Sequence, residues 1–298
     1  MNRLCVAILV VFLSLLCITG LTHRVWATEG GWGSYPNGAE DFMAGALPPP
    51  GTYLLNYFSY YHAPRVKDNS GGSAPVDVDV ECFADSVRIL HMTKKQVFGG
   101  NWSMHMLVPF VKVHASTPGG VDSKTGIGDI VVNPLLLGWH FTNWHFAAGI
   151  DTFIPVGAYN KNDIANIGRN YWTFEPVFAA TYLSDGGYEV SAKFMYDFNT
   201  KNTATDYRSG QEFHVDYTVG KKIDNMNIGI GGYYYKQITD DTLDGDTVHD
   251  NKGQVFAFGP QFRYGVKNMA FTVKYQWETL VKNRPQGEQF WFKFMYAF

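Results

Sequence analysis

The sequence predicts an all-β fold, a transmembrane antiparallel up-and-down β-barrel of about twelve strands. Three observations predict it: a composition rich in aromatic residues and poor in charge, segments of alternating apolar character, and connections that alternate between short and long. Aromatic residues make up 16% of the 298 residues and charged residues 17%, against ~25% charged residues in soluble domains. The formal net charge of −3 gives no reason to expect nucleic acid as a partner.

Residues 1–27 are expected to be a signal peptide for export. Arg3 supplies the positive start, residues 4–21 are apolar, and a small residue precedes the predicted cut. An uncleaved membrane anchor is the alternative, because the apolar run of ~18 residues is near the spanning length. A mature chain that starts at Thr28 keeps only Cys82, expected as a buried or lipid-facing thiol, so an intrachain disulfide is excluded. No later apolar run is long enough for a spanning helix, so a mature chain in a membrane must cross it as a closed barrel.

Residues 28–50 form an irregular segment rich in glycine and proline, too irregular for a strand and too short for a domain. Two interpretations remain open: a disordered leader, or a constriction lodged in the lumen of the barrel. We favour the lumen, because Phe42, Met43, Leu47 and the stiff run 48–50 need a dry surface to rest on.

Residues 51–298 are predicted to be the barrel itself. The predicted strands are 51–62, 78–92, 97–114, 127–142, 144–156, 170–183, 187–199, 210–222, 226–239, 253–266, 269–282 and 287–298. Tight connections are expected at 93–96, 143, 184–186, 224–225 and 267–268, and long polar ones at 63–75, 115–126, 157–169, 200–209 and 240–252. Short turns at one end and long loops at the other are typical of outer-membrane barrels, whose turns lie in the periplasm. An even number of strands then places both ends of the barrel on the periplasmic side.

Alternation also assigns the two faces of each strand. In the seventh predicted strand Val190, Phe194 and Phe198 share one face, while Glu189 and Lys193 share the other. So many large rings would overfill the interior of a barrel of about twelve strands, so we expect them to face lipid. Prolines cannot donate a hydrogen bond to the ladder and are expected to mark bulges or strand ends. Those inside predicted strands are Pro109, Pro134, Pro155, Pro176 and Pro260.

The final segment, FWFKFMYAF, is predicted to close the barrel by pairing with residues 51–62, which would remove an aggregation-prone edge. One face of this strand is expected to meet lipid. Its terminal phenylalanine, preceded by alternating aromatics, also resembles the C-terminal signal by which the barrel-assembly machinery recognises unfolded barrels. The residues of this face are Phe290, Phe292, Phe294, Tyr296 and Phe298.

The sequence carries little sign of catalysis. It holds no CxxC pair and no HExxH motif, and its nine histidines are scattered, so neither a metal nor a cofactor is expected. His214 lies between Glu212 and Asp216 on one strand face, where carboxylates could orient it as a general base, but no serine stands in a nucleophile motif. A solvated lumen histidine is the favoured interpretation, and no enzyme is expected.

Residues that face inward are the candidate lining of a lumen. They are Asp151, Phe153, Glu175, Lys193, Asp197, Glu212, His214, Asp216, Tyr235, Arg263, Lys274, Glu278, Trp291, Lys293 and Met295. Their mixed signs predict an ion-pair network inside a narrow barrel, and a selectivity filter is the alternative.

The segments GAEDFMAGALPPPGTYLLNYFSYY (38–61), VFGGNWSMHMLVPF (97–110) and GIGDIVVNPLLLGWH (126–140) resemble a family of outer-membrane transporters named for the meta-cleavage pathway of phenol degradation. The resemblance implies a porin-like barrel in the outer membrane of a Gram-negative bacterium, in contact with lipid and lipopolysaccharide, that admits small hydrophobic or aromatic solutes. The family has no assigned catalytic residues. Two alternatives remain open: a structural or adhesive barrel with a plugged lumen, and an outer-membrane hydrolase.

Overall fold

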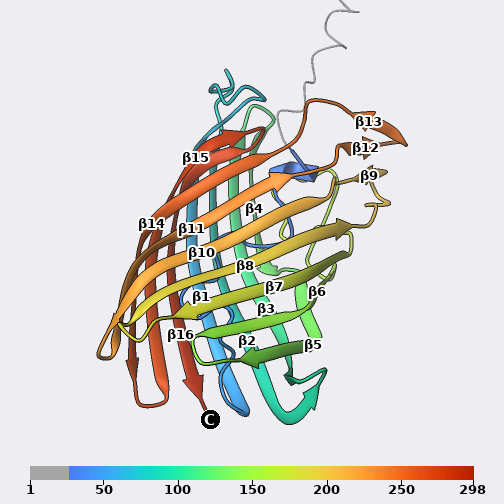
Figure 1. Cartoon of the computed structure of the whole chain (residues 1–298). Helices are drawn as coiled ribbons and strands as arrows, with labels where there is room; N and C mark the ends of the chain where they lie inside the picture. The colour runs from blue at the N-terminus through green and yellow to red at the C-terminus, as the bar shows by residue number, and fades with distance from the viewer. Residues whose placement is uncertain (1–26) are drawn as a thin grey trace, which may run out of the picture.

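The computed structural model describes residues 27–298, so the predicted signal peptide lies outside the described residues except for Ala27. Within this range twelve barrel strands pair antiparallel with their neighbours around a closed ring, and Figure 1 shows them tilted around a common interior. The predicted fold class is confirmed. The first strand β1 pairs with the last strand β16, from Tyr53↔Ala297 to Val66↔Pro285, and also with β2, while β2 pairs with β3 to complete the ring.

The barrel strands are β1 (Gly51–Val66), β2 (Asp79–Val97), β3 (Gly100–Thr117), β4 (Gly120–Ile127) with β5 (Ile130–His140), β6 (Trp144–Ile154), β7 (Thr173–Leu183), β8 (Tyr188–Asn199), β10 (Glu212–Ile223), β11 (Met226–Gln237), β14 (Gln254–Val266), β15 (Met269–Lys282) and β16 (Pro285–Ala297). Strands β4 and β5 together make one barrel strand, because both pair with β3. A short 3₁₀ helix, η1 (Glu29–Gly31), precedes the barrel. The loops at one end hold β9 (Tyr207–Arg208), β12 (Asp241–Leu243) and β13 (Asp246–Val248).

Two predicted connections are wrong. Residues 115–126 are not a loop, because β3 continues to Thr117 and β4 returns beside it from Gly120, so the hairpin extends the wall of the barrel. The turn expected at 93–96 lies within β2, and the chain reverses at Phe98 and Gly99, where both residues have positive φ. Polar residues misled both assignments, because strands that continue past the membrane carry polar side chains.

The prolines fall into two groups. Pro134 lies where the register of β5 shifts against β6, and Pro155 follows the end of β6, as expected for a bulge and a strand end. Pro109 lies beside the break between β4 and β5. Pro176 and Pro260 mark neither, because the register of β7 with β8 and of β14 with β15 continues unchanged across them. At these two positions residue pairs are missing from the strand ladder, but no extra residue is inserted as it would be in a bulge.

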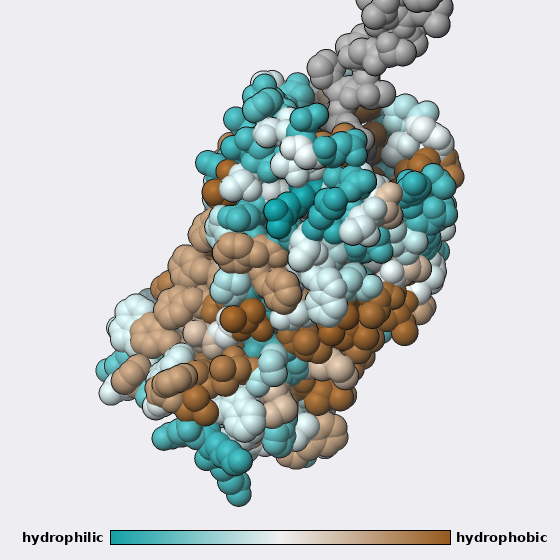
Figure 2. Space-filling view, turned by 90° about the vertical axis from the view of Figure 1, so that its right-hand side faces the viewer, coloured by the Kyte–Doolittle hydropathy of each residue, from teal (hydrophilic) through white to brown (hydrophobic). Residues whose placement is uncertain are grey.

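The outer wall carries the large apolar side chains. Phe174, Phe178, Val190, Phe194 and Phe198 are each about two-fifths to one-half exposed. Figure 2 shows apolar side chains gathered in a band across the face in view, with polar side chains above it at the end that carries the loops. Such a band matches the hydrocarbon layer of an outer membrane. Among residues 27–298 no helix is long and apolar enough to cross a membrane.

The N-terminal segment, residues 27–50, runs inside the barrel from one end to the other. At the loop end the Ala27 amide donates to the Asn283 carbonyl at 2.6 Å. At the turn end the chain enters β1 at Gly51, and the Phe298 amide donates to the Thr52 carbonyl nearby. Figure 1 shows this segment in blue within the ring of strands. The first strand of the barrel therefore begins, and the last strand ends, on the side of the short turns. The N-terminal segment that precedes the first strand begins on the side of the long loops.

Candidate functional site

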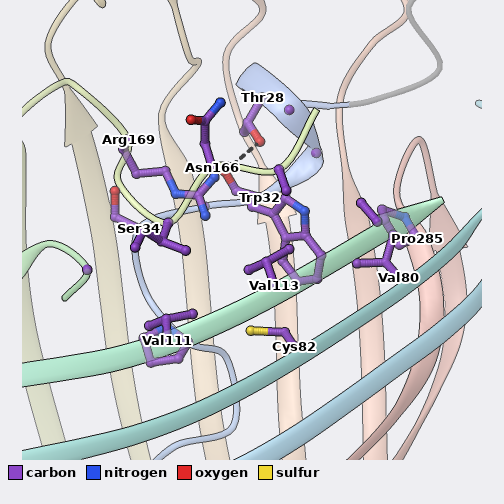
Figure 3. Close-up of a pocket in the computed structure, with 18 of the residues that line it drawn as sticks. Thr28, Trp32, Ser34, Val80, Cys82, Val111, Val113, Asn166, Arg169 and Pro285 are labelled. Carbon is purple, nitrogen blue, oxygen red and sulfur yellow. Dashed lines mark hydrogen bonds between the residues drawn. The ribbon is translucent and has the colours of Figure 1, made fainter. Parts of the chain in front are cut away.

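The outer half of the lumen holds a cavity of about 730 Å³. Its wall is a sheet of short apolar side chains on β2 and β3, because the inward positions of these strands are Val80, Cys82, Val111 and Val113. Figure 3 shows the Cys82 thiol on this wall, between the strands and the N-terminal segment. Cys82 thus faces the interior cavity, and the expected lipid-facing alternative is wrong.

Trp32 of the N-terminal segment covers the cavity from the opposite side. Its ring meets that of Tyr61 edge-on, with the ring centroids 5.3 Å apart. The segment is fixed above Trp32 by Glu29, whose carboxylate accepts hydrogen bonds from Thr205, Asn202 and Tyr159. Burial beside Glu29 raises the pKa of Tyr159, so the phenol stays a neutral donor. The roof of the cavity is therefore held by polar contacts to the loops, and its wall on β2 and β3 is apolar.

The loop between β6 and β7 forms one side of the cavity. Its fold depends on Gly157 and Gly168, because a Cβ built on Gly168 would lie 2.3 Å from the Gly157 carbonyl oxygen. Asp129 accepts from the amides of Gly157 and Arg169 at 2.9 and 2.7 Å. The Arg169 side chain reaches the cavity, as Figure 3 shows, and brings a positive charge to this side of it.

The inner half of the lumen holds a second cavity of about 390 Å³. Its lining mixes Leu55, Leu90 and Met295 with Lys293 and Arg263. Among the described residues none lines both cavities. The N-terminal segment is divided between them, since residues 28–37 border the outer cavity and most of residues 40–49 border the inner one. We call residues 35–41, which lie between the two, the partition.

Charged side chains of the wall hold the partition. Lys274 is fully buried and donates to the carbonyls of Gly38, Ala39 and Glu40. Arg88 pairs with Glu40 at 3.1 Å. Lys293 pairs with Asp41 at 3.1 Å and with Glu40 at 3.5 Å.

The partition is also tied to the strand opposite. Asp216 accepts from the Tyr35 hydroxyl at 2.6 Å and from the amides of Gly38 and Glu40 at 2.9 Å. Below the partition the Met43 amide donates to Glu189. Removing any one of these partners would leave a buried polar group unpaired, which costs about 1–3 kcal/mol per group.

The candidate lumen residues lie at the two cavities, at the partition and in a buried part of the inner wall. Phe153 and Glu278 border the outer cavity, with Glu278 accepting from Tyr61. Arg263, Lys293 and Met295 border the inner one. Asp151 meets Lys193 at 3.4 Å and His105 at 3.1 Å.

The remaining candidates are buried in the wall. Tyr235 lies under the Arg284 guanidinium at 4.0 Å, and Trp291 under the Lys274 ammonium at 5.2 Å. Glu175, Asp197, Glu212 and His214 form one cluster behind the N-terminal segment. Tyr235 and Trp291 therefore support charged side chains and do not border either cavity.

Sequence reasoning missed the residues that close the lumen. Arg88, Glu40 and Asp41 were absent from the candidates because they come from the poorly alternating second strand and from a segment without periodicity. Trp32 and Arg169 were missed for the same reason. A single charged residue among apolar neighbours, as Arg88 is on β2, was the available signal.

The geometry defines the class of protein: a closed twelve-strand β-barrel of the outer membrane with its N-terminal segment inside. The chain belongs to the family described as "Putative MetA-pathway of phenol degradation", whose sequence profile matches residues 63–294. The resemblance stated from the sequence is thereby confirmed. No curated protein matches the chain significantly.

Solved structures share the fold. An outer-membrane channel of the COG4313 group from Pseudomonas putida F1 is 18% identical, with a TM-score of 0.76 over 86% of this chain and 98% of that one. The β domain of the Bordetella autotransporter BrkA is 10% identical, with a TM-score of 0.52 over 84% and 100% of the two chains. The translocator domain of the autotransporter NalP from Neisseria meningitidis is 9% identical, with a TM-score of 0.51 over 85% and 91%. These likenesses show the fold and place the chain among outer-membrane barrels.

Proposed function

We propose that the protein is an outer-membrane channel for small hydrophobic or aromatic solutes, which bind first in the outer cavity. The observation that carries the proposal is the apolar wall of Val80, Cys82, Val111 and Val113 around a space of about 730 Å³. Small-molecule sites typically enclose 300–1,000 Å³ and are lined mainly by apolar side chains, with few polar groups that set orientation. Trp32 supplies an aromatic face, and Arg169 a polar contact at the edge.

Passage beyond the outer cavity requires a change at the partition. Residues 35–41 separate the two cavities and are held by Lys274, Arg88 and Lys293. The N-terminal segment is joined to the barrel wall by hydrogen bonds and ion pairs and not by a strand ladder. It can therefore shift without opening the barrel, and we infer that its displacement connects the two cavities.

Cys82 offers a direct test, because it is the only cysteine after residue 27 and faces the cavity. A bulky maleimide applied to intact cells that express the protein should attach to Cys82 and reduce uptake of a radiolabelled monoaromatic hydrocarbon. The matched Cys82→Ser variant should take up the hydrocarbon at the wild-type rate, and treatment with the maleimide should not change that rate. The hydrocarbon itself should slow the labelling of Cys82.

A plugged structural barrel is the second candidate, favoured by the continuous partition. It predicts that labelled and unlabelled cells take up the hydrocarbon at the same rate as cells without the protein. It also predicts no conductance in planar bilayers. Either result would contradict the channel proposal.

A further inference from the structure

Four carboxylates form a row across adjacent strands on the inner wall. Asp151 on β6 pairs with Glu175 on β7, and Asp197 on β8 pairs with Glu212 on β10. Glu175 falls opposite Asp197 in the register of β7 and β8, which Phe174↔Phe198 and Val177↔Met195 bracket. Neighbouring strands are about 4.8 Å apart, so like charges directly opposite each other repel. The row requires compensating positive charge.

Only the first member of the row has that compensation from a lysine or an arginine. Asp151 meets Lys193, His105 and the Asn133 amide. Among residues 27–298, no lysine or arginine forms an ion pair with Glu175, Asp197 or Glu212. All three are 0% exposed, so water does not screen them.

Several oxygens of these three carboxylates have no hydrogen-bond donor. Both oxygens of Glu175, Oδ1 of Asp197 and Oε2 of Glu212 are buried without a partner. An isolated buried carboxylate is strongly disfavoured unless it is paired, protonated or bound to a metal ion. Glu175 stands out because neither of its oxygens has a donor other than a carboxyl group, that of Asp197, in hydrogen-bond reach.

His214 completes the group and presents a lone pair to it. The Asn37 side-chain oxygen lies 2.6 Å from His214 Nδ1, so Nδ1 is the donor of this bond. The opposite nitrogen, Nε2, faces Asp197 Oδ2 at 3.1 Å and Glu212 Oε2 at 3.7 Å. Histidines that bind metal through one nitrogen usually donate from the other to an oxygen, which is the role that Asn37 plays here.

We propose that Glu175, Asp197 and His214 bind one divalent transition-metal ion, with Glu212 beside them as a further oxygen ligand. One ligand atom from each of the first three lies within 4.8 Å of the others. A tetrahedral Zn²⁺ ion with bonds of about 2.0–2.2 Å holds its ligand atoms about 3.4 Å apart, so the widest of these separations would shorten by about an ångström on binding. A set of one imidazole and several carboxylates suits Zn²⁺ and its first-row neighbours, and suits Ca²⁺, which takes oxygen ligands, less well.

The ion would lock the N-terminal segment onto the wall. Asn37 belongs to that segment, and a Cβ on Gly33 would lie 2.5 Å from Glu212 Oε2, so the backbone covers the cluster closely. Tyr35 packs its ring 5.8 Å from that of His214. The sequence gives no metal motif, because the ligands come from three strands and become neighbours only through their register. The site stands apart from the channel proposal, since it would bind metal whether or not solutes pass.

The test is Zn²⁺ binding by the purified full-length mature protein in detergent, without a histidine tag and after treatment with a chelator. We expect one Zn²⁺ per chain by elemental analysis and calorimetry. Glu175→Gln and Asp197→Asn should each weaken binding at least tenfold, and Asn37→Leu by about 10–100-fold as expected for a positioning residue. The matched control is Glu278→Gln, which removes a lumen carboxylate bound to Tyr61 and Tyr233 and should leave the affinity unchanged.

Folding of each variant is checked by heat-modifiable mobility on gels. Co²⁺ bound to the wild-type protein gives a second readout that needs no variant, since its visible absorption bands should appear on binding and disappear on adding Zn²⁺. Absence of Zn²⁺ and Co²⁺ binding by the wild type would overturn the proposal. Protons shared between neighbouring carboxyl groups would then be what offsets the negative charge of the row. Equal Zn²⁺ affinity in the wild type, Glu175→Gln and Asp197→Asn would also overturn it, because the ion would then be bound elsewhere.

Discussion

The outer cavity and the partition below it are built differently. In the outer half, the N-terminal segment covers an apolar wall of Val80, Cys82, Val111 and Val113 and leaves a cavity of about 730 Å³. In the partition the same segment is held by Lys274, Arg88 and Lys293 against buried carbonyls and carboxylates. One short segment thus lines a cavity over part of its length and separates two cavities over the rest. Apolar contacts tolerate a variable occupant, whereas directed polar contacts fix one position.

The largest effect is expected at Lys274. Lys274→Met keeps the length of the side chain but leaves the carbonyls of Gly38, Ala39 and Glu40 without their donor. Three unsatisfied groups cost several kcal/mol, since each costs about 1–3 kcal/mol. The partition should loosen, and planar-bilayer recordings should show open-channel events at least tenfold more often than in the wild type. Lys252→Met, at an exposed loop lysine, is the control and should behave as the wild type. An unchanged open frequency in Lys274→Met would show that the partition is not what closes the channel.

A smaller effect is expected at the Arg88–Glu40 pair, measured by a double-mutant cycle of Arg88→Met and Glu40→Gln. Both side chains are mostly buried, at 13% and 17% exposure, so the pair is weakly screened. We expect a coupling free energy of about 1–3 kcal/mol from the open frequencies of the four proteins. The effect of the double variant on the open frequency should be smaller than the sum of the two single effects, because either single change already breaks the pair. Additive effects would mean that the pair contributes nothing specific to closure.

The outer half is tested at Gly168. Gly168→Val places a side chain against the Gly157 carbonyl, so the loop between β6 and β7 must move away from the cavity. Such overpacking costs about 1–3 kcal/mol. Uptake of the monoaromatic hydrocarbon at low concentration should fall several-fold, while bilayer conductance changes little. Gly186→Ala in a short turn has no atom closer than 3.7 Å to the new Cβ and is the control.

The smallest effect is expected at the apolar wall. Val113→Ala removes two methyl-sized groups from the lining, and each buried CH₂ contributes about 0.8 kcal/mol. The solute covers only one side of these groups, so the loss is about half of that transfer free energy or less, and the concentration of hydrocarbon needed for half-maximal protection of Cys82 from maleimide should rise about twofold to fourfold. Val87→Ala on the lipid face of the same sheet should leave it unchanged.

Much of the barrel was predictable because lipid and lumen impose a period of two residues. The opposed faces of Val190 and Lys193, the closure of β16 on β1 and the inward direction of Asp216 and Lys274 all follow from alternation. The hairpin of β3 and β4 was not predictable in this way, because it continues beyond the membrane where polar residues are tolerated on both faces. The long-range partners inside the lumen were equally inaccessible. The pairing of Arg88 with Glu40 and the row of Glu175, Asp197 and Glu212 depend on the path of the N-terminal segment and on strand register.

The predicted signal peptide and the assembly role of the C-terminal aromatics stay predictions. Phe292 and Phe294 pack beside Phe271 on the outer wall, as the lipid-facing assignment expected. That packing serves the barrel wall and leaves recognition by the assembly machinery untested.

The N-terminal segment lies in the lumen and, in the proposed channel, must move for a solute to pass. A disulfide between Leu47→Cys and Gly138→Cys, in the Cys82→Ser background, tests it directly. A Cβ built on Gly138 lies 3.3 Å from the Leu47 Cβ, close to the spacing that a disulfide needs. We predict that oxidation forms this bond in intact cells, abolishes hydrocarbon uptake, and that a reductant restores it. Failure of the cysteines to join, or normal uptake by the cross-linked protein, would contradict the account.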